Sequence, residues 1–164
     1  MIAAISILLF VTIQRLGELV LARRNTLRLL ARGGVERAGW QYGPIVALHA
    51  VWLAGLWLLA WDSEISLPWL GVFVLLQAVR VWTLFTLGDR WTTRVIIVPG
   101  EARINAGPYR FFRHPNYLVV IGEIATLPLV FGMPLYALVF SIMNAILLYF
   151  RIMAENAALD EAEA

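Results

Sequence analysis

Two residue types, cysteine and lysine, are missing from this 164-residue chain, and each absence limits the chemistry available to it. Without thiols there is no disulfide framework, no covalent cysteine mechanism and no thiolate metal site. All thirteen basic residues are arginines, whose planar guanidinium groups suit paired contacts with carboxylates and phosphates. Histidine is also scarce, with two residues in the chain, so we expect no metal site.

Charge is scarce as well, while apolar residues are abundant. Charged residues make up 15% of the chain, hydrophobic residues 61%, and the mean hydropathy is +0.77. These values lie outside the range of an ordinary soluble domain and predict an all-α integral membrane protein. We expect a single domain over residues 1–164, because a bundle of this size has no room for a second core. No glycine-rich nucleotide loop, phosphate loop or GxSxG motif is present, and we expect no nucleic-acid partner.

Five apolar segments are candidates for membrane-spanning helices, each approaching the length needed to cross the hydrocarbon. They cover residues 2–22, 44–61, 68–87, 117–131 and 134–153. The fourth segment is short and contains Pro128, and the turn at residues 132–134 leads directly into the fifth. We therefore expect the last two spans to form a tight helical hairpin.

The arginines are unevenly distributed between the connections. Residues 23–37 after the first span carry five arginines, and so do residues 90–113 after the third, whereas the connection after the second carries Asp62 and Glu64. Short arginine-rich loops remain in the cytoplasm. We therefore expect the N-terminus outside, and the C-terminus, both basic connections and the functional site on the cytoplasmic side.

The connection over residues 88–116 is longer than most, and its composition is neither glycine-serine-rich nor disordered, which predicts an ordered loop. It ends in the stretch Gly-Pro-Tyr-Arg-Phe-Phe-Arg-His-Pro-Asn-Tyr over residues 107–117. Pro115 suits the first turn of a helix, where unpaired backbone N–H groups attract anions. Arg113 could hold a carboxylate or phosphate, and Tyr109 and Tyr117 could face an adenine or a cation. The residues alone leave open whether this stretch binds a ligand or anchors the chain at the lipid headgroups.

A second cluster lies on the last helix, where Arg151 and Glu155 are four residues apart and share a face. They form either an ordinary ion pair or part of a pocket shared with the long connection. Within the fourth span, Glu123 could accept a proton from a substrate or pair with Arg80 or Arg94. His49, isolated on the second span, is interpreted as a hydrogen-bonded packing residue rather than a ligand.

Residues 107–117 resemble the isoprenylcysteine carboxyl methyltransferase family, whose pattern is G-x-Y-x-x-x-R-H-P-x-Y. The matching residues are Gly107, Tyr109, Arg113, His114, Pro115 and Tyr117. The family's second motif, R-I-x-x-E-E-x-x-L, is met by Arg151, Ile152, Glu155 and Leu159. Two positions depart from the family: Val119 replaces a glycine and could narrow the approach to the cofactor, and Asn156 replaces a glutamate. Stretches near the N-terminus are similar to small bacterial members associated with phenolic lipids.

The resemblance implies a five-helix enzyme that binds S-adenosylmethionine in a cytoplasmic pocket built from about residues 88–164. The methyl acceptor would be a lipophilic molecule reaching the site from the lipids of a bacterial cytoplasmic membrane. O-methylation of a phenolic or pyrone lipid is favoured over methylation of a prenylcysteine-type carboxylate. The cofactor contacts carried over by position are Glu101, Ala102, Arg103, Ile104, Gly107, Tyr109, His114, Pro115, Asn116, Tyr117 and Glu155.

In the same reaction Arg151 would face the acceptor, and Glu123 or His114 would serve as the base if the acceptor is a phenol or enol. Two alternatives remain. One is an NADPH-dependent membrane reductase of the sterol-reductase type, which usually has more spans than this chain. The other is a non-catalytic membrane subunit, an alternative based on the departures from the family pattern at Val119 and Asn156.

Overall fold

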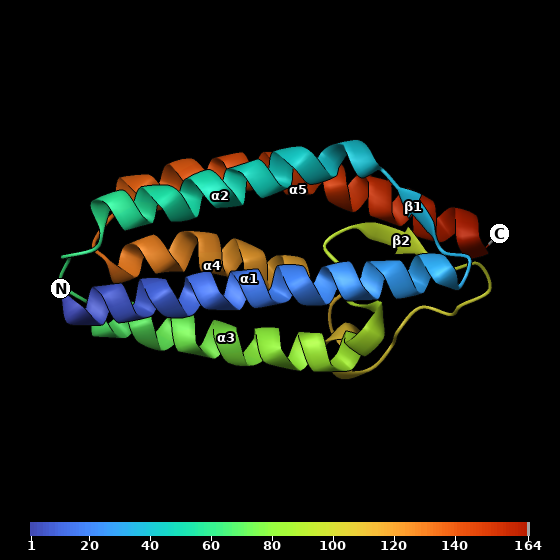
Figure 1. Cartoon of the computed structure of the whole chain (residues 1–164), viewed down its shortest axis with the longest axis horizontal. Coiled ribbons are helices and arrows are strands. Elements are labelled where there is room, and N and C mark those ends of the chain that lie inside the picture. Colours follow the sequence, from blue (N-terminus) through green and yellow to red (C-terminus); the bar gives the residue numbers. More distant parts are fainter. Residues whose placement is uncertain (164) are drawn as a thin grey trace.

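Five helices run along one long axis in the computed structural model, which describes residues 1–163 (Figure 1). They are α1 (Ile2–Ala31), α2 (Tyr42–Leu59), α3 (Leu67–Leu87), α4 (Pro115–Val130) and α5 (Pro134–Glu163). Between them lie the strands β1 (Val35–Arg37) and β2 (Val95–Ile97) and the short 3-10 helices η1 (Gly39–Gln41), η2 (Gly88–Arg90) and η3 (Gly107–Arg110). The predicted all-α membrane architecture is confirmed.

Four of the helices are long and apolar enough to cross a membrane, whereas α4 is shorter. Its 16 residues extend about 24 Å at 1.5 Å per residue, less than the roughly 30 Å of hydrocarbon in a bilayer. The length fits its position, because α4 packs against α3 and α5 and most of its side chains are buried. It is the central helix of a multi-pass bundle, and it needs little contact with lipid.

The hairpin expected between the last two spans is present. α4 ends at Val130, and Gly132 adopts a left-handed backbone with φ 70°, a conformation that glycine enters without steric cost. The backbone N–H of Met133 returns to the carbonyl of Pro128 at 2.9 Å, and Pro134 then opens α5. These bonds use the last carbonyls of α4 and reverse the chain within a few residues.

Two helices continue beyond the predicted spans. α1 reaches Ala31, past the span predicted to end at residue 22, and α5 reaches Glu163, past the span predicted to end at residue 153. Hydropathy marks where a helix leaves the lipid, which need not be where the helix ends. Leu29 and Ala158 are both buried beyond the apolar segments, so the extensions are stabilised by packing against the connections at that end.

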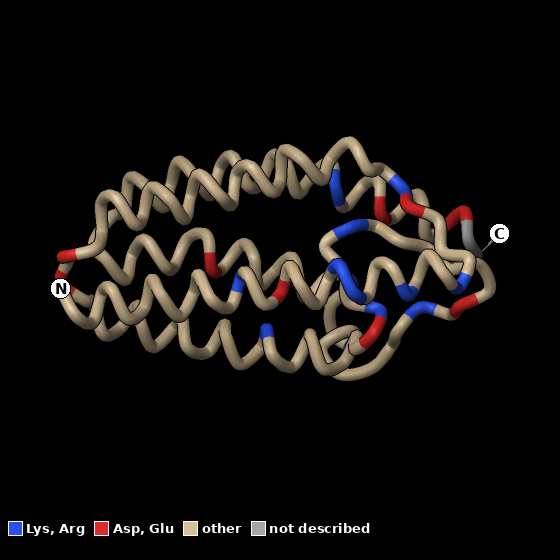
Figure 2. Tube along the Cα trace, in the orientation of Figure 1, with Lys and Arg blue, Asp and Glu red and all other residues tan. Residues whose placement is uncertain are grey.

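Most charged residues gather at the end of the bundle where α1 and α5 extend and the long connection folds back (Figure 2). We call this the charged end. The connection between α2 and α3 lies at the opposite end and carries Asp62 and Glu64. The arrangement agrees with the arginine distribution, and an N-terminus outside with the charged end in the cytoplasm stays a prediction.

The connection over residues 88–116 is ordered, as predicted, and pairs with a distant part of the chain. β1 and β2 are antiparallel, with Val35 opposite Ile97 and Arg37 opposite Val95. The buried side chain of Asn25 in α1 donates to the carbonyls of Gly88 at 3.1 Å and Trp91 at 2.8 Å. The connection is therefore held against α1 and β1, and it covers the charged end of the bundle.

Gly107 begins η3 where the connection passes close to α3. Its φ is 52°, and an added Cβ would lie 2.4 Å from Oγ1 of Thr86, which is itself hydrogen-bonded to the carbonyl of Trp82 at 2.8 Å. Both the backbone conformation and the close approach therefore require glycine at this position. Gly107 positions the start of the motif that follows it.

We expect Gly107→Ala to destabilise the protein by about 1–3 kcal/mol, because the alanine would be strained and would collide with α3. The measurement is the midpoint of thermal unfolding in detergent. Gly71→Ala is the matched control, since that helical glycine has nothing within 4 Å of an added Cβ. Equal midpoints for the two variants would contradict the assigned close contact.

Candidate functional site

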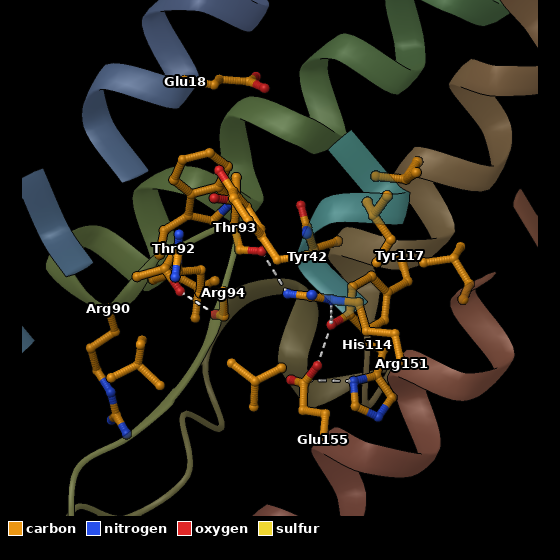
Figure 3. A pocket seen from close by; sticks show the side chains of 18 of the residues that line it. Glu18, Tyr42, Arg90, Thr92, Thr93, Arg94, His114, Tyr117, Arg151 and Glu155 are labelled. Atoms are coloured by element: carbon orange, nitrogen blue, oxygen red, sulfur yellow. Dashed lines mark hydrogen bonds and ion pairs between the residues drawn. The ribbon is translucent and has the colours of Figure 1, made fainter. Parts of the chain in front are cut away.

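A cavity of about 710 Å³ begins at the charged end and reaches into the bundle. Its size lies within the range of about 300–1,000 Å³ typical of ligand pockets. Its walls come from α1, α2, α3, the segment around β2, the start of α4 and the C-terminal part of α5. Residues far apart in the sequence therefore surround one space, and Figure 3 shows the part at the charged end.

Tyr117 in the first turns of α4 links the two residues predicted on α5. Its hydroxyl donates to Oε2 of Glu155 and accepts from Nε of Arg151 at 2.8 Å (Figure 3). Nη2 of Arg151 donates to the backbone carbonyl of Thr93 at 2.8 Å. Arg151 is buried, with 6% of its surface exposed. It is therefore a cation held in one orientation by α4 and the long connection.

His114 packs beside this group, immediately before α4. Its ring stacks on that of Tyr117 with centroids 5.4 Å apart, and its Nε2 lies 3.0 Å from Oδ1 of Asn156. Its Nδ1 lies 3.8 Å from Oε1 of Glu155, close enough for an ion pair when the ring is protonated. Asn156, which departs from the family motif, keeps a hydrogen-bonding role by holding His114.

Tyr109 of η3 lines the same end of the cavity. Burial, and then the negative charge of Glu155, raises the pKa of Tyr109 well above its usual value. The phenol stays protonated at physiological pH and can donate a hydrogen bond. Aromatic faces from Tyr109 and Tyr117 beside a carboxylate suit a ligand that carries a positive charge. The charged end therefore presents aromatic rings and a carboxylate to a ligand, beside several arginines.

Several residues of this end were not predicted as site residues. The guanidinium of Arg94 lies 4.3 Å from the ring centroid of Tyr42, and it also donates to both carboxylate oxygens of Glu36 at 2.8 Å. Thr93 holds Arg151 through its backbone. These contacts depend on the pairing of β1 with β2, whose signal in the sequence is the β-branched run at residues 95–97.

Most of the predicted cofactor residues line the cavity, and four do not. Those that line it are Arg103, Ile104, Tyr109, His114, Asn116, Tyr117 and Glu155, together with Arg151. Those outside are Glu101, Ala102, Gly107 and Pro115. Glu101 instead forms ion pairs with Arg32 and with Arg90, the latter at 3.3 Å. The position of these four favours a role in shaping the connection. Val119 is buried away from the cavity, so the expected narrowing of the cofactor approach is not seen.

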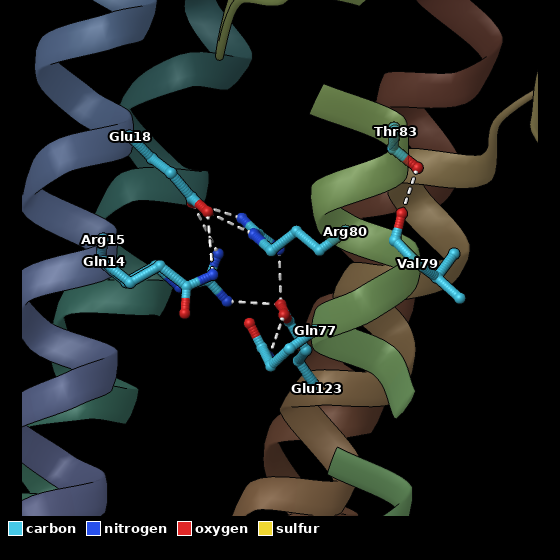
Figure 4. A network of polar contacts seen from close by, with 8 residues as sticks. All are labelled: Gln14, Arg15, Glu18, Gln77, Val79, Arg80, Thr83 and Glu123. Carbon is cyan, nitrogen blue, oxygen red and sulfur yellow. Dashed lines mark hydrogen bonds and ion pairs between the residues drawn. The ribbon is translucent and has the colours of Figure 1, made fainter. Parts of the chain in front are cut away.

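Glu123 belongs to a buried ion cluster, which we define as Arg15 and Glu18 of α1, Arg80 of α3 and Glu123 of α4 (Figure 4). Oε2 of Glu123 accepts from Arg15 and from Arg80, each at 2.6 Å. Its Oε1 accepts from Gln77 at 2.7 Å. The expected pairing with Arg80 is confirmed, whereas Arg94 pairs with Glu36.

Glu123 has 1% of its surface exposed and does not line the cavity, although the other three members of the cluster do. Both of its oxygens already accept hydrogen bonds from charged or amide donors. The structure therefore gives no support to Glu123 as the catalytic base, and that role stays a prediction. The cluster contains two cations and two anions, so its charges compensate each other where water is excluded.

The fold and the cavity define a class of protein: a multi-pass helical membrane protein whose pocket combines a charged end with apolar walls between the helices. Residues 69–161 match the isoprenylcysteine carboxyl methyltransferase (ICMT) family, and the chain belongs to this family. The resemblance predicted from the two motifs is confirmed, and it places the chain in a methyltransferase family. The chain is also 37% identical over 154 residues to "Uncharacterized protein YpbQ" of Bacillus subtilis (strain 168), covering 91% of this chain and 92% of that protein. No solved structure matches the chain.

We expect Glu123→Gln to lower the midpoint of thermal unfolding, because the variant leaves the ion cluster with an uncompensated buried cation. Breaking such a pair typically costs about 3–5 kcal/mol. Asp89→Asn is the control, since its partner Arg28 lies with it at the surface, where ion pairs contribute little. An unchanged midpoint with a lost methyl-transfer rate would show instead that Glu123 is the base.

Proposed function

We propose that the chain is an S-adenosylmethionine-dependent methyltransferase that methylates an oxygen of a lipophilic acceptor inside the membrane. The acceptor class we favour is a phenolic or pyrone lipid, ahead of a prenylcysteine-type carboxylate. The observation that carries the proposal is one continuous cavity with two kinds of wall. At the charged end it is lined by Glu155 and aromatic rings, and elsewhere by apolar residues of α1, α2 and α5, among them Leu16, Leu19, Ile45, Val46, Leu53 and Leu148.

The charged end fits the chemistry of the proposed cofactor, which combines a sulfonium cation, an adenine and several polar groups. Glu155 can offset positive charge or accept hydrogen bonds, and Tyr109, His114 and Tyr117 provide ring faces. Arg103, Ile104 and Asn116 complete the wall on the side of the long connection. When bound, S-adenosylmethionine supplies an electrophilic methyl group. The residues of the chain bind it and exclude water from it.

Arg151 is suited to orienting the acceptor. Its Nε and Nη2 are fixed by Tyr117 and Thr93, while no partner of Nη1 is found among residues 1–161. A guanidinium held in this way can stabilise negative charge developing on an acceptor oxygen. Methyl transfer from a sulfonium is an in-line displacement that depends mainly on alignment and exclusion of water. A rigid, buried arginine contributes to both requirements.

In this proposal the apolar walls of the cavity lie at the depth of the lipid tails, so that an acceptor with an apolar tail would remain in the bilayer while it reacts. We place the protein in a bacterial cytoplasmic membrane with the charged end in the cytoplasm. The arginine-rich connections at that end support this orientation. A water-soluble cofactor would then reach the site from the cytoplasm and the acceptor from the membrane.

Titration of the purified protein with S-adenosylhomocysteine and with NADPH tests the proposal. We expect the first to bind and the second not to bind. We also expect Glu155→Ala to weaken the binding of S-adenosylhomocysteine at least about tenfold, because loss of a charge-assisted contact costs about 1.5–3 kcal/mol. Glu161→Ala is the control on the same helix, since Glu161 is exposed and contacts Arg37 outside the cavity.

Binding of NADPH alone would favour the membrane reductase. Binding of neither compound would favour a non-catalytic subunit, and either result would overturn the proposal. If S-adenosylhomocysteine binds equally well to Glu155→Ala and to the wild type, the placement of the cofactor at Glu155 is wrong.

A further inference from the structure

The cavity has a polar inner part that the family motifs do not account for. Arg15, Glu18 and Arg80 of the buried ion cluster line it together with His49 of α2. His49 lies seven residues after Tyr42, about 10 Å further along α2 from the charged end. Polar groups at such a depth are costly in a membrane, and those that line a cavity are candidates for function.

The hydrogen bond of His49 determines which of its ring nitrogens carries a proton. Nδ1 lies 2.8 Å from the backbone carbonyl of Ile45. A carbonyl oxygen only accepts hydrogen bonds, so Nδ1 bears the hydrogen and the neutral ring has its lone pair on Nε2. No partner for Nε2 is found in the part of the chain that the structure describes. His49 therefore offers a hydrogen-bond acceptor to the cavity.

The groups around this inner part are already compensated. Arg80 binds Glu18 through two nitrogens and Glu123 through the third, and Arg15 contacts the same two carboxylates. No excess positive charge remains there to hold a carboxylate acceptor. A neutral hydroxyl, by contrast, needs only an atom that accepts its proton, and Nε2 of His49 is such an atom. The inner part therefore suits a hydroxylated acceptor.

The other candidates for a base are less available. The carboxylate of Glu123 accepts three hydrogen bonds and lies outside the cavity. Both ring nitrogens of His114 face α5, one toward Asn156 and the other toward Glu155. Among the described histidines and carboxylates that line the cavity, His49 has the ring nitrogen with an unused lone pair.

We propose that His49 is the general base that takes the proton of the acceptor hydroxyl. This inference rests on the proposed methyl transfer. The O–H bond of the acceptor breaks and its proton moves to Nε2 of His49. The oxygen uses its electron pair to form a bond to the methyl carbon of the sulfonium donor. The carbon–sulfur bond breaks, its electron pair stays on sulfur, and a neutral thioether leaves.

The imidazolium formed by this step would lie near groups of both signs. Charged and titratable groups line the cavity from each of the five long helices: Arg15 and Glu18 on α1, Tyr42 on α2, Arg80 on α3, Tyr117 on α4, and Arg151 and Glu155 on α5, with Glu123 behind Arg80. The proton can return to water when the products leave.

The test compares the wild type with His49→Gln and His49→Phe on two acceptors. One is a long-chain alkylphenol, and the other is the same compound with a nitro group beside the hydroxyl, which makes it ionised at the assay pH. Loss of general-base catalysis should slow methylation of the alkylphenol at least about 100-fold. The ionised nitrophenol needs no base, and its rate should change by less than about threefold.

The pH profile of kcat/KM for the alkylphenol should lose one ionisation in both variants. Affinity for S-adenosylhomocysteine reports whether each variant is folded, and we expect it to be unchanged. Val51→Ala is the matched control, because Val51 is exposed on the same helix and does not line the cavity. Its rates should remain close to those of the wild type.

If the His49 variants methylate both acceptors equally more slowly, or neither more slowly, the role of His49 is overturned while methyl transfer stands. A wild type that methylates a fatty carboxylate of equal chain length but neither phenol would overturn the acceptor class in the same way. A wild type that does not bind S-adenosylhomocysteine would overturn the proposed function itself, and this inference with it.

Discussion

The ion cluster between α1, α3 and α4 is the interaction that fixes the arrangement of the bundle. Arg80 is bound on one side to Glu18 and on the other to Glu123. One guanidinium therefore fixes the positions of α1, α3 and α4 along the bundle axis relative to each other. Apolar side chains in lipid can slide past each other at low cost, whereas a separated buried charge finds no water to replace its partner. The ion pairs of Glu123 with Arg15 and Arg80 hold α4 in register with α1 and α3.

The cavity owes its two kinds of wall to the central position of α4. The start of α4 brings Tyr117 between Arg151 and Glu155 at the charged end, and the β1–β2 pair closes the same end over α1. Further in, α1 and α2 face the space with leucine, isoleucine and valine side chains and with the polar residues of the ion cluster and His49. One space therefore presents a charged surface and an apolar surface next to each other.

The sequence predicted the helices, the hairpin and the meeting of two motifs, because apolar length and motif spacing are local properties. It did not predict the ends of α1 and α5, which depend on packing beyond the lipid, or the pairing of two three-residue strands about 60 positions apart. The path of the connection at Glu101 and Ala102 depends on those strands. The sequence therefore placed both residues at the cofactor, although neither lines the cavity. His49 was expected to be a packing residue, since an isolated histidine on an apolar helix carries no sequence signal that it borders a cavity.

The cavity takes its walls from the first helix and the last, which has a consequence for biosynthesis. A chain emerging from the ribosome can insert α1 to α4 and complete the ion cluster before α5 is made. Arg151 and Glu155 then arrive last and close the pocket against Tyr117. The bundle would thus stay without a closed pocket until α5 is made, and a chain cut short before α5 would lack the wall that carries Arg151 and Glu155.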